Sequence, residues 1–82
     1  MALRTQRQDI NSATVAYTIA EWDDETGNGE LVEYDRDGRQ RRRCVLAYLP
    51  NNGTAAPGDV IGEAAWYDAS GVELERKPIL EP

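Results

Sequence analysis

Carboxylates and arginines are the side chains of this sequence that could do chemistry, and they fall in two adjacent runs. Eight acids lie between residues 21 and 37, and four arginines follow between residues 39 and 43. Positioned carboxylates can act as general acids and bases or bind hard cations such as Ca²⁺. Arginines bind phosphate and carboxylate groups. Each of these possibilities can be tested against the spacing of the residues.

The acidic run does not form a metal site. Glu33, Asp35 and Asp37 place oxygens at alternate positions before Gly38, as a calcium loop does. The twelfth position of that loop would be Cys44, where a bidentate Glu is needed. The sequence at residues 23–25, Asp-Asp-Glu, offers carboxylates, but nothing in the sequence fixes their geometry. We therefore predict no metal site and no cofactor.

The residue types also argue against an enzyme. The chain has no histidine and a single cysteine, Cys44. This composition excludes Ser-His-Asp triads, Cys-His dyads, His/Cys zinc sites and an internal disulfide. No phosphate-binding glycine motif is present, and a domain of 82 residues rarely frames a deep cleft for a carboxylate pair. We predict that the protein is not an enzyme.

The arginine run is more consistent with internal ion pairs than with nucleic-acid binding. In a regular strand Arg42 points to the face opposite Arg41 and Arg43, which would divide the positive charge. Fifteen acids against nine bases give a net charge of −6, which repels nucleic acid. The sequence therefore argues against a nucleic-acid partner, and we expect the arginines to face the acids of the preceding strand.

Alternating apolar and polar residues predict β-strands throughout, and no segment has the apolar spacing of a helix. The fold class we predict is all-β: a small antiparallel five-stranded meander, rolled into a barrel or sandwich, with an extended N-terminal arm. Residues 44–49 are apolar at successive positions, as in a central strand that is covered on both faces. The predicted strands are 13–22, 30–35, 39–49, 60–67 and 72–77, with Pro78 ending the last one.

Two similar turns join these strands. Asp35–Gly38 and Asp68–Gly71 both suit a type I turn whose glycine takes positive φ. The two turns belong to hairpins that resemble each other at an offset of 33 residues. Shared turn chemistry and a true duplication both explain this likeness, and the sequence leaves the two alternatives open. The matching positions are Gly29/Gly62, Glu30/Glu63, Tyr34/Tyr67, Asp35/Asp68, Gly38/Gly71 and Arg43/Arg76.

The domain organisation follows from length and composition. Residues 1–12 form a polar N-terminal arm, and residues 13–82 form a single β domain. We expect no membrane span and no conventional secretory signal, because no apolar stretch is long enough. A chain this short has a marginal core, and such domains often depend on docking or oligomerisation for stability.

These observations predict a non-enzymatic structural or interaction module that docks into a larger assembly. The setting we expect is a viral or phage particle, with the chain as a capsid-decorating or tail-accessory protein found in the virion or the host cytoplasm. The partner is another protein or further copies of this chain. The predicted contact residues lie on the arm, on the long loop at residues 50–59 and on two aromatics: Leu3, Arg4, Arg7, Ile10, Trp22, Asn51, Asn52 and Tyr67.

An alternative function rests on the acidic run. A small acidic inhibitor of the kind that phages use could mimic the charge of a nucleic acid and bind a basic host enzyme. Its contact residues would be Glu21, Asp23, Asp24 and Glu25.

Overall fold

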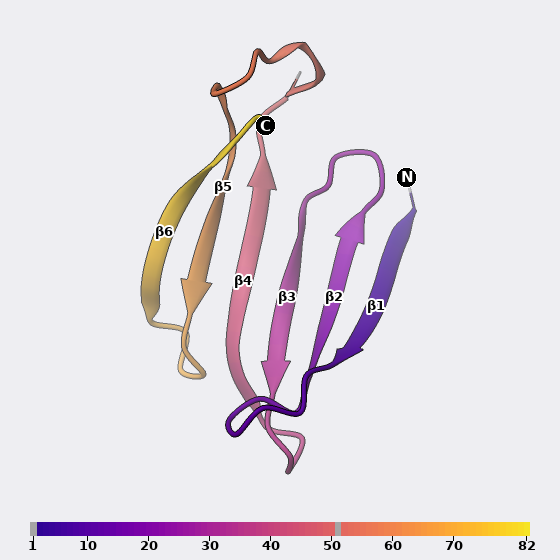
Figure 1. Cartoon of the computed structure of the whole chain (residues 1–82), viewed down its shortest axis with the longest axis vertical. Helices are drawn as coiled ribbons and strands as arrows, with labels where there is room; N and C mark the ends of the chain where they lie inside the picture. Colours follow the sequence, from indigo (N-terminus) through magenta and orange to yellow (C-terminus); the bar gives the residue numbers. More distant parts are fainter. Residues whose placement is uncertain (1, 51) are drawn as a thin grey trace.

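Six strands form one continuous antiparallel sheet in which each strand pairs with its neighbour in the sequence. A computed structural model describes residues 2–50 and 52–82. The chain runs up and down across the sheet from one edge to the other (Figure 1). The strands are β1 (Leu3–Asp9), β2 (Tyr17–Asp23), β3 (Gly29–Tyr34), β4 (Gln40–Tyr48), β5 (Val60–Tyr67) and β6 (Glu73–Leu80), and a short 3₁₀ turn spans Asn52–Thr54.

The predicted all-β antiparallel meander is confirmed, but the predicted number of five strands is wrong. Most of the expected N-terminal arm is a sixth strand, β1, which pairs with β2 along its full length. Every residue of β1 is exposed. Its sequence carries no apolar alternation because an edge strand can be held by backbone hydrogen bonds without burying side chains. Prediction of strands from the sequence pattern depends on that alternation, so β1 was not predicted.

The predicted barrel or sandwich is not formed, because the sheet is open and one layer thick. β1 and β6 lie at opposite edges (Figure 1). The radius of gyration is 14.1 Å, whereas a globular chain of this length has roughly 12 Å. The most buried apolar residues, Val32, Cys44, Ile61 and Ala65, still expose 5–9 % of their surface.

β4 shows what this architecture means for the apolar residues. Its sequence predicts a strand covered on both faces, and β4 is indeed central, between β3 and β5. No second sheet or α-helix lies over either of its faces in the described part of the chain. The burial of its side chains therefore comes from neighbours within the same sheet.

Both predicted turns are confirmed and share one set of hydrogen bonds. The Asp35 carboxylate accepts the amides of residues 37 and 39, and the Asp68 carboxylate accepts those of residues 70 and 72. Gly38 and Gly71 have φ of 79° and 89°, a region that side-chain-bearing residues rarely adopt.

The likeness between the hairpins β3–β4 and β5–β6 extends beyond these turns. Glu30 pairs with Arg43 in the first hairpin, and Glu63 pairs with Arg76 at the equivalent positions of the second. Both hairpins also carry a bulge shortly after the turn, between residues 40 and 43 in the first and between residues 73 and 75 in the second. Turn chemistry alone does not require the ion pair, so the structural likeness covers the whole hairpin.

Pro78 does not end the last strand, contrary to the prediction. It lies within β6 opposite Glu63. Proline lacks the N–H that a central strand needs, but an edge strand has one unpaired side and tolerates it.

Two strand glycines allow neighbouring backbones to approach closely. A Cβ at Gly29 would lie 2.1 Å from the Glu21 carbonyl oxygen, and one at Gly62 would lie 2.5 Å from that of Ala47. No real side chain tolerates such contacts, so the paired strands would have to separate.

We predict that Gly29→Ala and Gly62→Ala each lower the free energy of unfolding by at least about 1–3 kcal/mol. Gly53→Ala is the matched control, because no atom lies within 4 Å of its added Cβ. Urea denaturation followed by circular dichroism measures the change. Equal stability of all three variants would contradict the close approach.

Candidate functional site

The sheet has two faces of different character, which the strand register defines. Residues that are paired across neighbouring strands project to the same face. One row, Gln6–Ala20–Leu31–Cys44–Trp66–Glu75, and the next, Arg4–Trp22–Gly29–Leu46–Ala64–Lys77, belong to what we call the tryptophan face. The row Arg7–Ile19–Val32–Arg43–Tyr67–Glu73 and the pair Tyr17–Tyr34 belong to the tyrosine face.

Charged side chains cover the tyrosine face. The guanidinium carbon of Arg7 lies 4.0 Å from the ring centroid of Tyr17, whose ring stacks on Tyr34 at 5.0 Å. Arg43 lies 5.4 Å from the centroid of Tyr67 and bonds Glu30 at 3.5 Å. Long charged side chains that cover apolar surface while their heads remain in water are typical of a solvent-facing side.

The tryptophan face has less of this cover. Its charged pairs lie at the β1 edge, where Arg4 bonds Asp24, at the β6 edge, where Lys77 bonds Glu75, and at the turn end of β3–β4, where Arg42 bonds Glu33 and lies over the ring of Trp66. The side chains between them on β2–β5 are apolar or aromatic: Ala20, Trp22, Leu31, Cys44, Leu46, Tyr48, Ala64 and Trp66.

A hollow of about 310 Å³ opens on this uncharged centre. Ala20, Trp22, Leu31, Leu46 and Tyr48 line it, together with Glu21, Gly27 and Glu30. The absent side chains of the strand glycines leave room for two of the aromatics. Gly29 lies against the Cα and Cβ of Trp22, and Gly62 lies against the ring of Tyr48.

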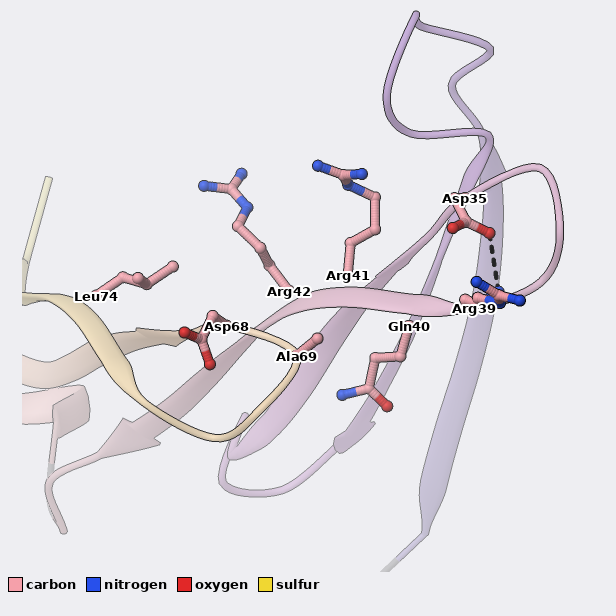
Figure 2. A pocket seen from close by; sticks show the side chains of 8 residues that line it. All are labelled: Asp35, Arg39, Gln40, Arg41, Arg42, Asp68, Ala69 and Leu74. Carbon is pink, nitrogen blue, oxygen red and sulfur yellow. Dashed lines mark hydrogen bonds between the residues drawn. The ribbon is translucent and has the colours of Figure 1, made fainter.

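A second hollow, of about 410 Å³, lies where β4 leaves its turn. Asp35, Arg39–Arg42, Asp68, Ala69 and Leu74 line it (Figure 2). Arg41 and Arg42 rise from the same side of β4, whereas Gln40 points the other way (Figure 2). The expectation that Arg42 points opposite Arg41 is therefore wrong. The physical reason is the β-bulge between β3 and β4, which adds one residue to β4 and interrupts the alternation.

The arginines at this end differ in their partners. Arg42 bonds Glu33 at 2.7 Å and lies 4.6 Å from the ring centroid of Trp66, so the predicted pairing with the preceding strand is confirmed for this residue. Arg39 and Arg41 form no ion pair with any acid in the described residues. The carboxylates of Asp35 and Asp68, which share the hollow, accept hydrogen bonds from turn amides.

The predicted contact residues are divided between the two faces. Trp22 and Arg4 belong to the tryptophan face, whereas Arg7 and Tyr67 belong to the tyrosine face. Leu3 is 66 % exposed on β1, and Ile10 is exposed just beyond that strand. Asn51 lies outside the described residues, and Asn52 begins the 3₁₀ turn at the opposite end of the sheet from the arginines.

Asp23 and Asp24, two of the four acids of the alternative function, hold local structure. Asp23 accepts the amides of Glu25 and Thr26 and so closes the β2–β3 turn. Asp24 accepts hydrogen bonds from Ala2 and Arg4 and holds the start of β1. Glu21 is exposed on β2, on the tyrosine face.

Sequence reasoning missed most of the tryptophan face. Leu46 and Tyr48 lie in the 44–49 segment that the sequence predicts to be covered on both faces, and Leu31 and Trp66 are not among the predicted contact residues. The signal that was present is the absence of charge at alternate positions 44, 46 and 48 and at 62, 64 and 66. Only the register brings these two sets together with residues 20, 22 and 31.

Among residues 2–50 and 52–82, no three His, Cys, Asp or Glu side chains are grouped to hold a metal ion. Within the same residues there is no helix with the length and apolar character to cross a membrane. No family model, curated protein or solved structure matches the chain.

Cys44 gives a chemical probe of the tryptophan face. Burial raises the pKa of its thiol, and the nearby Arg42 guanidinium opposes part of that rise. A raised pKa leaves less of the reactive thiolate at a given pH.

We therefore predict that Cys44 reacts with an aromatic disulfide reagent at pH 8 more slowly than a free cysteine. Unfolding in urea should restore the ordinary rate, and Trp66→Ala, which removes the side chain paired with Cys44, should raise it in the folded protein. An ordinary rate in the native wild-type protein would contradict the burial.

Asp68 gives a probe of the arginine end. A hydrogen bond from the Ser70 hydroxyl, followed by those from the turn amides, lowers the pKa of its carboxyl group. Because the folded-state pKa lies below the unfolded value, the associated stability is present above the unfolded pKa. It is lost as the pH falls through the folded pKa.

We predict that Ser70→Ala raises the pKa of Asp68, and that the stability difference from wild type disappears at low pH. Carboxyl NMR titration measures the pKa. Ser12→Ala is the control, because the Ser12 hydroxyl bonds the Val15 backbone instead. An unchanged Asp68 titration in Ser70→Ala would show that the hydroxyl does not stabilise the carboxylate.

Proposed function

We propose that this chain is a non-enzymatic interaction module that docks its tryptophan face onto a protein surface within a larger assembly. One observation carries the proposal. The sheet is a single layer, and the uncharged centre of the tryptophan face has no covering element in the described chain. Stable domains bury the apolar face of a sheet against a second layer. A partner protein that lies on the tryptophan face would supply this missing layer.

The residue types of the face support docking. Trp22, Tyr48 and Trp66 offer large rigid surfaces, and such aromatics provide much of the energy at protein interfaces. The hollow beside Trp22, Leu31 and Leu46 could receive a side chain from the partner. The opposite face, covered by Arg7, Arg43 and Arg76, suits water instead.

The setting that we propose for this module is a viral or phage particle, where it would decorate a capsid or accompany a tail. Mass spectrometry of purified particles tests that setting separately from the docking surface. Recovery of the chain in stoichiometric amounts is expected. Absence of the chain from the particles would contradict the viral or phage setting but would not contradict docking through the tryptophan face.

We predict that the dissociated chain binds an apolar fluorescent dye through the tryptophan face. Leu46→Lys should abolish most of that fluorescence, because it places a charge in the uncharged centre. Ala47→Lys is the matched control: Ala47 is the next residue of β4, is exposed and projects to the opposite face beside Glu63.

The measurement combines dye fluorescence with sedimentation at several concentrations, so that a covered face is distinguished from an absent one. Equal dye binding by Leu46→Lys and wild type, both monomeric, would overturn the proposal. Circular dichroism establishes that each variant keeps its sheet.

A further inference from the structure

We propose that the surface covering the tryptophan face is the same face of a second copy of this chain. The two sheets would then stack face to face, with the strands of one copy antiparallel to those of the other. The end of one sheet that carries Arg39, Arg41 and Arg42 would lie over the end of the other sheet that carries Asp23, Asp24 and Glu25. This inference rests on the proposed function and names the partner.

The first argument is surface area. The chain exposes 5768 Å². A globular monomer of 9.1 kDa exposes roughly 4,900 Å², so this chain has an excess of roughly 900 Å². A standard protein interface buries about 800 Å² on each partner. Covering one face with one copy therefore accounts for the excess.

The second argument is the charge of the face itself. The whole chain carries −6, which would favour a basic partner. The charged residues on the tryptophan face differ from this average: Arg4, Arg41, Arg42 and Lys77 stand against Asp24, Glu33 and Glu75. A basic partner would meet these cations. With a second copy as the partner, the uncharged centres of the two tryptophan faces would contact each other.

The third argument fixes the relative orientation. The loop end of the sheet, where β2, β4 and β6 finish, carries Asp23, Asp24, Glu25, Asp59 and Glu81. Placing two such ends together would bring like charges into contact. A two-fold axis in the plane of the sheet and perpendicular to the strands avoids this contact. It brings each acidic end over the opposite end of the other copy, where Arg36, Arg39, Arg41 and Arg42 lie beside Asp35, Asp37 and Asp68 and the charge is more nearly balanced.

This orientation also gives Arg41 a partner. Its guanidinium has no acid within the described chain. In the proposed sandwich it lies over the loop end of β4 in the second copy, where Tyr48 lies close to Gly27 of the acidic β2–β3 turn. Sheets in such sandwiches stack about 10 Å apart, a distance that arginine side chains can bridge.

The experiment measures mass and orientation in the full chain. Sedimentation equilibrium of wild type and Ala47→Lys should give twice the monomer mass, whereas Leu46→Lys should give the monomer. Ala20→Lys, which lines the hollow and removes no large side chain, serves as a second variant if Leu46→Lys fails to fold. Arg41→Glu should weaken the dimer roughly tenfold at low salt.

Orientation is read from spin labels on Asp37→Cys in a Cys44→Ala background. Asp37 lies in the turn at the arginine end. The proposed sandwich separates the two labels by about the 43 Å length of the molecule, whereas the opposite orientation brings them together. Short label distances would overturn the orientation proposed here.

The remaining outcomes separate this inference from the proposed function. A wild-type monomer that binds the apolar dye overturns the second copy but leaves the docking face intact for another protein. A dimer that persists in both Leu46→Lys and Ala20→Lys overturns the tryptophan face as the interface, and with it the proposed function.

Discussion

The structure depends on one constraint: a single sheet forms the whole fold, so both faces of that sheet are also the surface of the protein. A two-layer domain hides the apolar side of each layer in its core, but here the side chains on both faces have only lateral neighbours. Val32 and Cys44 reach burial on the two central strands, and Thr18 and Ala65 reach it on the strands beside them, each with neighbours on both sides within the sheet. Larger residues in the same rows, such as Trp22 and Trp66, keep part of their surface in contact with water.

The two faces meet this constraint in different ways. On the tyrosine face, cations from neighbouring strands lie over aromatic rings and pair with acids, as Arg43 does with Tyr67 and Glu30. That arrangement covers apolar carbon with groups that water solvates well. The tryptophan face has one such arrangement, Arg42 over Trp66 and paired with Glu33, and it lies at the turn end of the sheet. Among the described residues, no cation lies over the rings of Trp22 and Tyr48. Asymmetry between the faces, more than total hydrophobicity, therefore identifies the surface that is suited to docking.

The turns and the order of neighbouring strands were predictable from the sequence, whereas the register between strands and the number of layers were not. The turns at Asp35 and Asp68 follow from residue type and spacing, and so does the antiparallel meander. β1 was missed because its residues bury nothing, and the openness of the sheet was missed because an apolar strand such as β4 has the same sequence whether or not a layer covers it. Arg41 lies on the same side of β4 as Arg42, and not on the opposite side as predicted, because a bulge adds one residue to β4. No pattern in the sequence predicts that bulge. The docking face itself needed the register, which joins residues from four strands.

The edges of the sheet explain why contact through a face is favoured over growth of the sheet. Closure into a barrel, or addition of a further strand, needs edges with free N–H and C=O groups and compatible side chains. β6 presents Lys77 and Pro78, and β1 presents Arg4, Arg7 and Asp9, all of which discourage another strand from pairing. Exposed leucines lie on these edge strands as well, Leu3 on β1 and Leu74 and Leu80 on β6. Because both edges are protected against strand pairing, contact through the tryptophan face is favoured. The repeated hairpin extends this face, because β3–β4 and β5–β6 carry a turn and a bulge at the same end and lie side by side in the sheet.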